Sequence, residues 1–180
     1  MTENTIQIGD QAPSFELPNV DGQAELLGEP GGAPATVVYW TCNHCPYALA
    51  WHDRLLDVAR DYADRGVRVL AVNSNDAERY PQDGPQAMRE RVQAEGGWPN
   101  PYLFDESQDV ARAFGAERTP EVFVFGPDLQ LRYRGAPDAD YEDEGQNAAW
   151  LRGSLDAVLA GREPDPAETE PVGCTIKWRG

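Results

Sequence analysis

Hydrophobic and polar positions along the chain follow two periods, one typical of strands and one typical of helices. The β-branched and aromatic run at 36–41 predicts a buried strand, and the run at 67–74 predicts a second strand. From Pro46 onward, apolar residues return at spacings of three and four until Gly66, which predicts a helix that ends at the glycine. Strand, helix and strand in this order predict a right-handed crossover in a largely parallel sheet.

The chain before residue 36 is irregular and rich in Gly and Pro. After a polar loop at 75–84, the second half of the chain predicts shorter strands and helices. The proline that opens the next helix and the two glycines that end it are suitable start and stop signals. Ser107 is the candidate N-cap of a second, short helix. The predicted elements are a helix at 85–97, a strand at 101–105, a helix at 107–115, a hairpin of 121–126 with 129–135, and an amphipathic helix at about 146–160.

Composition limits the class of protein. A chain of 180 residues with 41% hydrophobic residues can bury one sizeable core, so we expect a single domain. There are 31 acidic residues against 15 lysines and arginines, the net charge is −16, and Lys177 is the only lysine. Such a surface repels polyanions, which argues against nucleic acid as a partner. It is typical of halophilic proteins, and this hypothesis predicts higher thermal stability in molar KCl than in low salt.

The beginning of the chain has no basic start and no apolar stretch of signal-peptide length, and no segment approaches a membrane span. We therefore expect a cytoplasmic protein without a membrane partner. Three cysteines are too few for a secreted disulfide scaffold. In a reducing compartment, a C-x-x-C pair points to catalysis or to metal binding.

The stretch "WTCNHCPY" places Cys42 and Cys45 between the first predicted strand and the helix. The positive end of a helix favours a thiolate, which predicts Cys42 as the nucleophile and Cys45 as the thiol that resolves a mixed disulfide. Pro46 fits the first turn because its missing N–H would be unpaired there. His44 lies between the cysteines, where a partly charged imidazole would stabilise the Cys42 thiolate.

These residues resemble the thioredoxin fold. "VVYWTCNHC" is similar to its strand and active-site segment, and "RTPEVFVFGPDLQLRYRG" at 118–135 is similar to its cis-proline strand and hairpin partner. The resemblance implies a cis peptide bond before Pro120, which packs against the active-site cysteines. It also implies that the Thr119 backbone offers an edge where an extended substrate pairs by β-type hydrogen bonds. The lead-in from residue 8 resembles the branch that contains peroxiredoxins and cytochrome-maturation thioredoxins, so the likeness covers roughly 8–160.

Two motifs in order, "CNHCPY" and the terminal "GCTIKW", resemble a peroxiredoxin-like group of bacterial and archaeal proteins. The peroxiredoxin pattern P-x-x-x-T-x-x-C, aligned on Cys45, puts Val38 at the proline and the first cysteine at the threonine. The arginine that polarises peroxide in that family normally lies on the strand where this chain has Thr119 and Pro120, with Arg118 as the nearest substitute. Peroxide reduction therefore ranks second to disulfide exchange.

The chain also differs from thioredoxin itself. Thr36 stands where thioredoxin carries a buried aspartate, so proton transfer needs another base, such as a water or a loop carboxylate. His44 lies where strongly oxidising periplasmic enzymes of this fold also place histidine. Because a stabilised thiolate raises the reduction potential, the resemblance implies a pair less reducing than thioredoxin.

Alternative interpretations remain open at this point. Cys42 and Cys45 could form half of a zinc site that Cys174 and a histidine, His44 or His52, complete. Cys174 follows a Pro- and Glu-rich segment in a semi-apolar stretch, so we expect the tail at 161–180 to fold back and dock. Near the other cysteines its thiol could resolve or relay a disulfide; elsewhere it would be buried and inert.

The sequence therefore predicts an α/β thioredoxin fold with four or five strands in a mixed sheet, an N-terminal extension within a domain at 1–160, and a docked tail. The predicted activity is thiol-disulfide exchange on a protein disulfide, with recycling by a thiol reductant and without a metal or organic cofactor. The alternatives are a thiol peroxidase and a zinc-bound or redox-inactive binding module, and the chain is expected to be a monomer or homodimer. The predicted site residues are Cys42, His44, Cys45, Thr119, Pro120 and Cys174.

Overall fold

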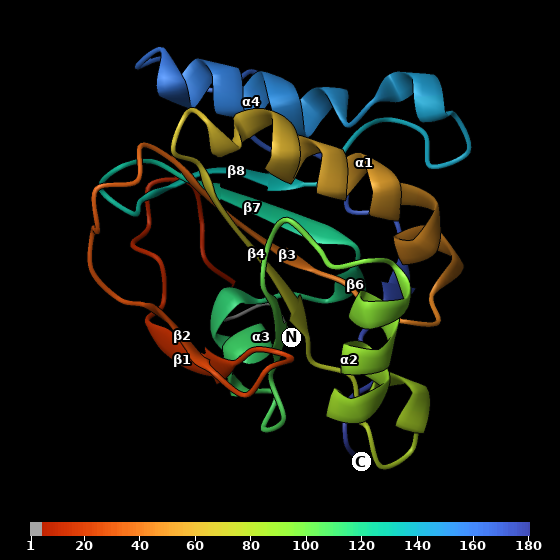
Figure 1. Cartoon of the computed structure of the whole chain (residues 1–180). Helices are drawn as coiled ribbons and strands as arrows, with labels where there is room; N and C mark the ends of the chain where they lie inside the picture. Colours follow the sequence, from red (N-terminus) through yellow and green to blue (C-terminus); the bar gives the residue numbers. More distant parts are fainter. Residues whose placement is uncertain (1–4) are drawn as a thin grey trace.

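The computed structural model describes residues 5–180 and has a five-stranded sheet at its centre, in the order β5-β4-β3-β7-β8 (Figure 1). β3, β4 and β5 run parallel to one another, β7 is antiparallel to β3, and β8 is antiparallel to β7. The mixed sheet of the thioredoxin fold is thus confirmed. The strands are β3 (Thr36–Trp40), β4 (Arg68–Asn73), β5 (Tyr102–Phe104), β7 (Glu121–Phe125) and β8 (Leu131–Gly135).

Helices cover both faces of this sheet. α1 (Pro46–Ala63) and α4 (Ala149–Leu159) lie on one face and α3 (Asp109–Phe114) lies on the other, while α2 (Pro85–Ala94) lies beside the end of the sheet (Figure 1). Alternate residues of β3 point to opposite faces, so Tyr39 packs with α1 and Trp40 packs with α3. Because both faces are covered, every residue of β3 is buried, as its continuous apolar run predicts.

The N-terminal segment was predicted to be irregular, and this prediction is wrong. β1 (Phe15–Pro18) and β2 (Ala24–Leu27) form an antiparallel hairpin. Its turn is organised by Asn19, whose side chain accepts the N–H groups of Asp21 and Gln23. The strands are only four residues long and bury alternate residues, so their period is too short to stand out from a loop.

The start of α3 also differs from the prediction. Gln108, not Ser107, occupies the N-cap position. The Asp105 carboxylate accepts the N–H groups of Val110 and Ala111 at 3.4 and 3.0 Å, so it takes the capping role. A carboxylate at the end of the preceding strand is close enough to replace the expected cap.

The C-terminal tail docks onto the domain, as predicted. β9 (Cys174–Thr175) pairs antiparallel with β6 (Arg118–Thr119), and Ile176 beyond it is buried. The predicted loop at 75–84 contains a short 3-10 helix, η1 (Pro81–Asp83), and a second one, η2 (Glu144–Gln146), precedes α4. No helix in the described part of the chain is both long and apolar enough to cross a bilayer.

Candidate active site

The two cysteines of the C-x-x-C motif lie where β3 ends and α1 begins, as the sequence predicts. Both are free thiols, and the exposed fractions of Cys42 and Cys45 are 1% and 0%. Cys45 is the N-cap residue of α1, and Pro46 occupies the first helical position. Neither sulfur is open to a large partner in this conformation.

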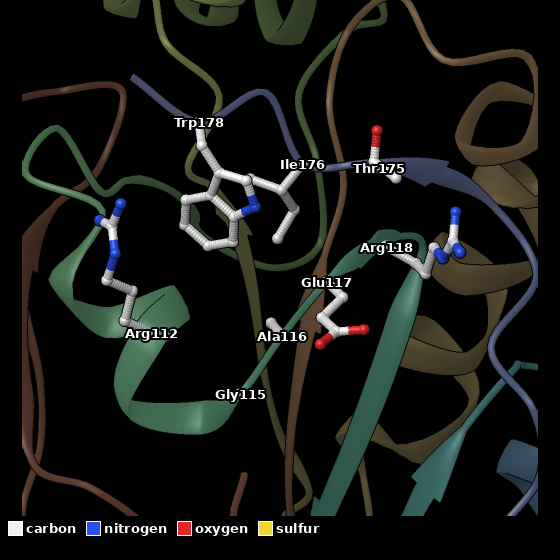
Figure 2. Close-up of a pocket in the computed structure, with 8 residues that line it drawn as sticks. All are labelled: Arg112, Gly115, Ala116, Glu117, Arg118, Thr175, Ile176 and Trp178. Atoms are coloured by element: carbon white, nitrogen blue, oxygen red, sulfur yellow. The ribbon is translucent and has the colours of Figure 1, made fainter. Parts of the chain in front are cut away.

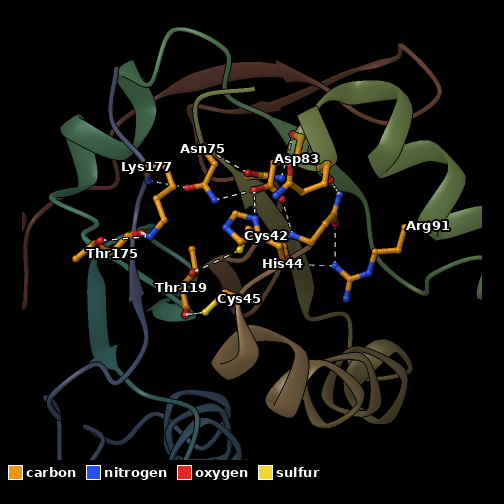
Figure 3. A network of polar contacts seen from close by, with 12 residues as sticks. Cys42, His44, Cys45, Asn75, Asp83, Arg91, Thr119, Thr175 and Lys177 are labelled. Atoms are coloured by element: carbon orange, nitrogen blue, oxygen red, sulfur yellow. Dashed lines mark hydrogen bonds and ion pairs between the residues drawn. The ribbon is translucent and has the colours of Figure 1, made fainter. Parts of the chain in front are cut away.

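The predicted cis-proline loop lies against the pair. The peptide bond between Thr119 and Pro120 is cis. The Cys45 thiol donates to the Thr119 carbonyl at 3.2 Å, and the Cys42 Sγ lies 3.7 Å from the Thr119 hydroxyl (Figure 3). Residues about 75 positions apart in the chain therefore form one site, and the sequence predicted this juxtaposition.

The free substrate edge predicted at Thr119 is wrong, because the chain's own tail occupies it. Thr119 pairs with Cys174 in the antiparallel ladder, and Arg118 pairs with Thr175. Gly173 makes this approach possible, since a Cβ there would lie 2.2 Å from the Thr119 carbonyl oxygen. Cys174 is half-buried and packs against the buried pair. All three cysteines thus meet in one cluster.

The contacts of the two sulfurs favour a thiolate on Cys45 rather than on Cys42, where the sequence predicts it. The pKa of Cys45 is lowered chiefly by hydrogen bonding from the Cys42 thiol and, against the opposing effect of burial, further by Cys174, the Thr119 side chain and the Ala48 N–H. Ala48 is the third residue of α1, so its N–H is one of the donors that a helix leaves free. We therefore expect the first thiolate of the reduced pair on Cys45, which gives up its hydrogen bond to the Thr119 carbonyl when it ionises.

Cys42 has the opposite surroundings. Its pKa is raised by the hydrogen bond to Cys45, by burial and by the carboxylate of Asp83, against the smaller lowering by the backbone N–H of His44. A buried negative charge near a sulfur disfavours a second negative charge on it. Cys42 therefore stays protonated while Cys45 is ionised.

His44 lies beside Cys42, but its ring is paired with a carboxylate. Nδ1 of His44 is 2.5 Å from Oδ2 of Asp83, a close contact without aligned hydrogen-bond geometry. The imidazole also stacks on Tyr80, with ring centroids 5.4 Å apart and planes 7° from parallel. The predicted stabilisation of a Cys42 thiolate by His44 is therefore offset by Asp83.

Asp83 is the residue that the sequence analysis missed. Its side chain is fully buried and accepts the Asn43 N–H at 2.7 Å and the Asn75 side-chain amide at 3.0 Å (Figure 3). A buried carboxylate is costly unless it is paired and hydrogen-bonded, and here it is both. Its only sequence signal is an acidic residue between the prolines of "YPQDGP", which resembles an ordinary turn.

The segment between the two cysteines is held from α2 and β5. The guanidinium of Arg91 donates to the Cys42 carbonyl at 3.2 Å and to the Asn43 side chain at 2.9 Å. The Tyr102 hydroxyl donates to the same Asn43 oxygen at 2.8 Å. The loop therefore holds Cys42 close to Cys45 through contacts with distant elements.

Arg118 does not supply the arginine of a peroxidase site. Its guanidinium donates to the Gly173 carbonyl at 3.4 Å. The same side chain lines a cavity of about 620 Å³ between α3 and the tail, together with Arg112 and Trp178 (Figure 2). No cysteine lines this cavity, so Arg118 holds the tail.

The zinc hypothesis finds a different set of residues from the predicted one. Among the described residues, ligand atoms of Cys42, His44 and Asp83 lie within 4.8 Å of one another. Two ligands of one tetrahedral zinc ion lie about 3.3 Å apart, given metal–ligand distances of about 2.0 Å. The 2.5 Å contact between His44 and Asp83 is too short for this. His52 instead contacts Glu95 at 2.6 Å, away from the cysteines.

Comparisons with known proteins show the family and the fold of the chain. The sequence model of the AhpC/TSA family matches residues 8–134. The chain is 40% identical to a conserved protein of Geobacillus kaustophilus with a crystal structure, with coverage of 98% of this chain and 94% of that one and a TM-score of 0.91. Peroxidoxin BcpB of Mycobacterium tuberculosis shares the fold, at 18% identity and a TM-score of 0.61, with 86% and 95% of the two chains covered.

A curated relative carries a name that describes thiol chemistry. The chain is 25% identical over 126 residues to thiol-disulfide oxidoreductase ResA of Geobacillus thermodenitrificans. The match covers 68% of this chain and 66% of that protein. The likeness therefore spans slightly less than two thirds of the relative's length.

Proposed function

The chain belongs to the AhpC/TSA family, and on this basis we propose that it is a thiol-disulfide oxidoreductase. The pair formed by Cys42 and Cys45 cycles between dithiol and disulfide, and it exchanges with a disulfide of a partner protein. The observation that carries this proposal is the position of both sulfurs on Thr119, next to the cis proline and at the N-terminus of α1. The name of the ResA relative supports the same chemistry.

Cys45 carries the thiolate of the reduced pair and attacks the partner disulfide. Its lowered pKa gives a thiolate at neutral pH, which is the reactive form of a cysteine. Cys42 then attacks the Cys45 sulfur, closes the intramolecular disulfide and releases the partner as a thiol. This order reverses the one predicted from the sequence, because the contacts around the pair lower the pKa of Cys45 and raise that of Cys42.

The proton of Cys42 goes to the pair of His44 and Asp83. A ring nitrogen, a carboxylate oxygen and the Cys42 sulfur lie within 4.8 Å of one another. The imidazole accepts the proton when Cys42 attacks, and the carboxylate stabilises the imidazolium that forms. This pair replaces the buried aspartate of thioredoxin, whose position is Thr36 here.

An equilibrium redox titration against glutathione buffers, read by thiol trapping and mass, tests the proposal. We expect a reversible two-electron transition between Cys42 and Cys45 at a potential above the thioredoxin value of about −270 mV. If no disulfide forms between them at any potential and zinc co-purifies from anaerobic preparations, the exchange mechanism is wrong.

Peroxide reduction is a second candidate, favoured by one observation. Cys45 aligns with the peroxide-reactive cysteine of peroxiredoxins and has a lowered pKa. Arg118 donates to Gly173 in the tail, which keeps this candidate second. Hydrogen peroxide consumption by the reduced protein decides between them: a rate far above that of a free thiol of matched pKa would favour the peroxidase.

The expected partners follow from the chemistry. A protein disulfide is the substrate and a cellular thiol is the reductant, in the cytoplasmic location expected from the sequence. Neither half of the cycle requires a metal or an organic cofactor.

A further inference from the structure

We propose that Cys174 is a third redox thiol, through which the buried pair exchanges electrons with its reductant. This inference rests on the proposed function and adds the point of contact with the reducing partner. The tail at 173–179 acts as an internal substrate: it occupies the edge at Thr119 and carries a cysteine in the register of that edge.

The geometry places Cys174 on the pair. In the ladder between β6 and β9, Cys174 is the direct partner of Thr119, which contacts both buried sulfurs. Cys174 packs against the cluster of Cys42, Cys45 and Ala48. Because an antiparallel partner has a fixed register, the thiol meets the pair whenever the tail is docked.

The tail is held in this register by contacts of the two residues that follow Thr175. Its Ile176 N–H donates to the Glu117 carbonyl at 2.9 Å, and its Lys177 N–H donates to the Asn75 side chain at 2.9 Å. The Gln108 side-chain amide donates to the Lys177 carbonyl at 2.9 Å. A tail that only covered the surface would not need so many polar contacts with three separate segments.

Accessibility separates the three thiols. Cys42 and Cys45 are at most 1% exposed, whereas Cys174 is only half-buried. A reductant can reach Cys174 without displacing the tail, but it cannot reach the pair. The docked tail therefore blocks direct reduction of the pair and offers a relayed path in its place, whereas a partner disulfide reaches Cys45 when the tail lifts.

The relay step balances without an outside oxidant. In the oxidised protein, Cys174 first loses its proton to water. Its thiolate attacks Cys45, so a Cys45–Cys174 disulfide forms, the Cys42–Cys45 bond breaks, and Cys42 leaves and takes up a proton from His44. A reductant thiolate then attacks the Cys174 sulfur and releases Cys45 as a thiolate. A second reductant thiol frees Cys174 and leaves with the first as a disulfide.

The charge environment suits this order of events. Partial burial and the neighbouring Cys45 raise the pKa of Cys174 to about 11 in the reduced protein, so Cys174 rests as a thiol. Oxidation removes the Cys45 thiolate and its effect on that pKa. When the reductant attacks Cys174, Cys45 is the leaving group, and its lowered pKa favours this second step.

The first test maps disulfides by mass spectrometry after mild oxidation with oxidised glutathione. We expect the wild type to contain both the Cys42–Cys45 and the Cys45–Cys174 disulfides, and C174S to contain only the first. Stopped-flow reduction by dithiothreitol should be at least tenfold slower for oxidised C174S than for the wild type. A Cys42–Cys45 disulfide without any link to Cys174, and with equal reduction rates, would overturn the relay and leave the exchange activity intact. Failure to form Cys42–Cys45 would instead overturn the proposed function.

A second variant separates the thiol from the docking. Gly173→Ala keeps all three cysteines, but its methyl group collides with Thr119, so the tail should lift. We expect the Cys45–Cys174 disulfide to be lost and iodoacetamide to label the pair at least tenfold faster. The exposed neighbour Val172→Ala is the matched control and should behave as the wild type. A Gly173→Ala protein that still forms the wild-type amount of Cys45–Cys174 disulfide would contradict the proposal.

Discussion

Two thiols that lie three residues apart have opposite surroundings in this protein. Cys42 faces the loop at 75–84 and the fully buried carboxylate of Asp83. Cys45 faces the start of α1 and the docked tail, which supply hydrogen-bond donors. The pKa values of the two thiols are therefore shifted in opposite directions, that of Cys45 downward and that of Cys42 upward.

The comparison teaches that the spacing of a C-x-x-C motif does not decide which sulfur ionises. The decision comes from where the helix begins and from which distant segments close over the pair. Here α1 begins at Pro46, and the flanking segments come from positions more than 35 residues downstream.

Replacement of Cys42 or Cys45 by serine should have the largest effect on disulfide exchange, and the two variants should behave differently. C45S removes the thiolate, so we expect loss of exchange to background. C42S keeps the attacking thiolate but cannot resolve, so it should trap a partner as a stable mixed disulfide on Cys45. Trapping is measured by mass after incubation with a disulfide-bonded peptide. A mixed disulfide on Cys42 in C45S, and none in C42S, would restore the order predicted from the sequence.

Asp83→Asn tests what the carboxylate does to Cys42 through two measured quantities, the pKa of Cys42 and the rate of disulfide closure. Removal of the carboxylate lowers the pKa of Cys42, since the charge that raised it is gone. Disulfide closure at neutral pH should nevertheless slow by about 10- to 100-fold, because the imidazole loses its counter-charge. Thiolate absorbance at 240 nm gives the first readout and stopped-flow closure gives the second.

The exposed Glu78→Gln, in the same loop, is the control for general effects of lost charge. It should change neither readout. If Asp83→Asn closes as fast as the wild type, His44 and Asp83 do not handle the Cys42 proton.

Asn75→Ala should have the smallest effect, because it removes only the side chain that joins Asp83 to the docked tail. The Asn75 amide donates to Asp83 at 3.0 Å and accepts the Lys177 N–H at 2.9 Å. The substitution leaves both groups less satisfied, so the free energy of unfolding should fall by about 1–3 kcal/mol, measured in urea. Labelling of Cys174 by iodoacetamide should rise only a few-fold. Unchanged stability would mean that water replaces both contacts.

The sequence predicted the parts of this site that depend on local pattern. The strand before Cys42 and the helix after Cys45 are confirmed, and so is the cis Pro120, which the resemblance to the thioredoxin fold implied. The terminal stretch around Cys174 was expected to dock, because its semi-apolar residues need cover, and it does.

The unpredicted parts depend on contacts across the fold. Asp83 lies in a loop without periodicity, and its partners come from two other segments. The edge at Thr119 was expected to be open, and only the register of β9 reveals that the chain covers it. The start of α1 at Pro46 is as predicted, and the different choice of thiolate comes from the side-chain and backbone contacts of the two sulfurs, which the sequence does not show.

The central claim, that Cys45 holds the thiolate of the reduced pair, is tested most directly by titration of thiolate absorbance in C42S and C45S, each with C174S. Because the pKa of Cys45 lies below the ordinary value of 9.0, its signal should be present at pH 7 and disappear as the pH falls. The serine hydroxyl in C42S can still donate to Cys45, so this variant should keep that transition. C45S should show no thiolate until the pH exceeds 9.0, because burial and Asp83 still raise the pKa of Cys42. A low transition in C45S and none in C42S would contradict the account.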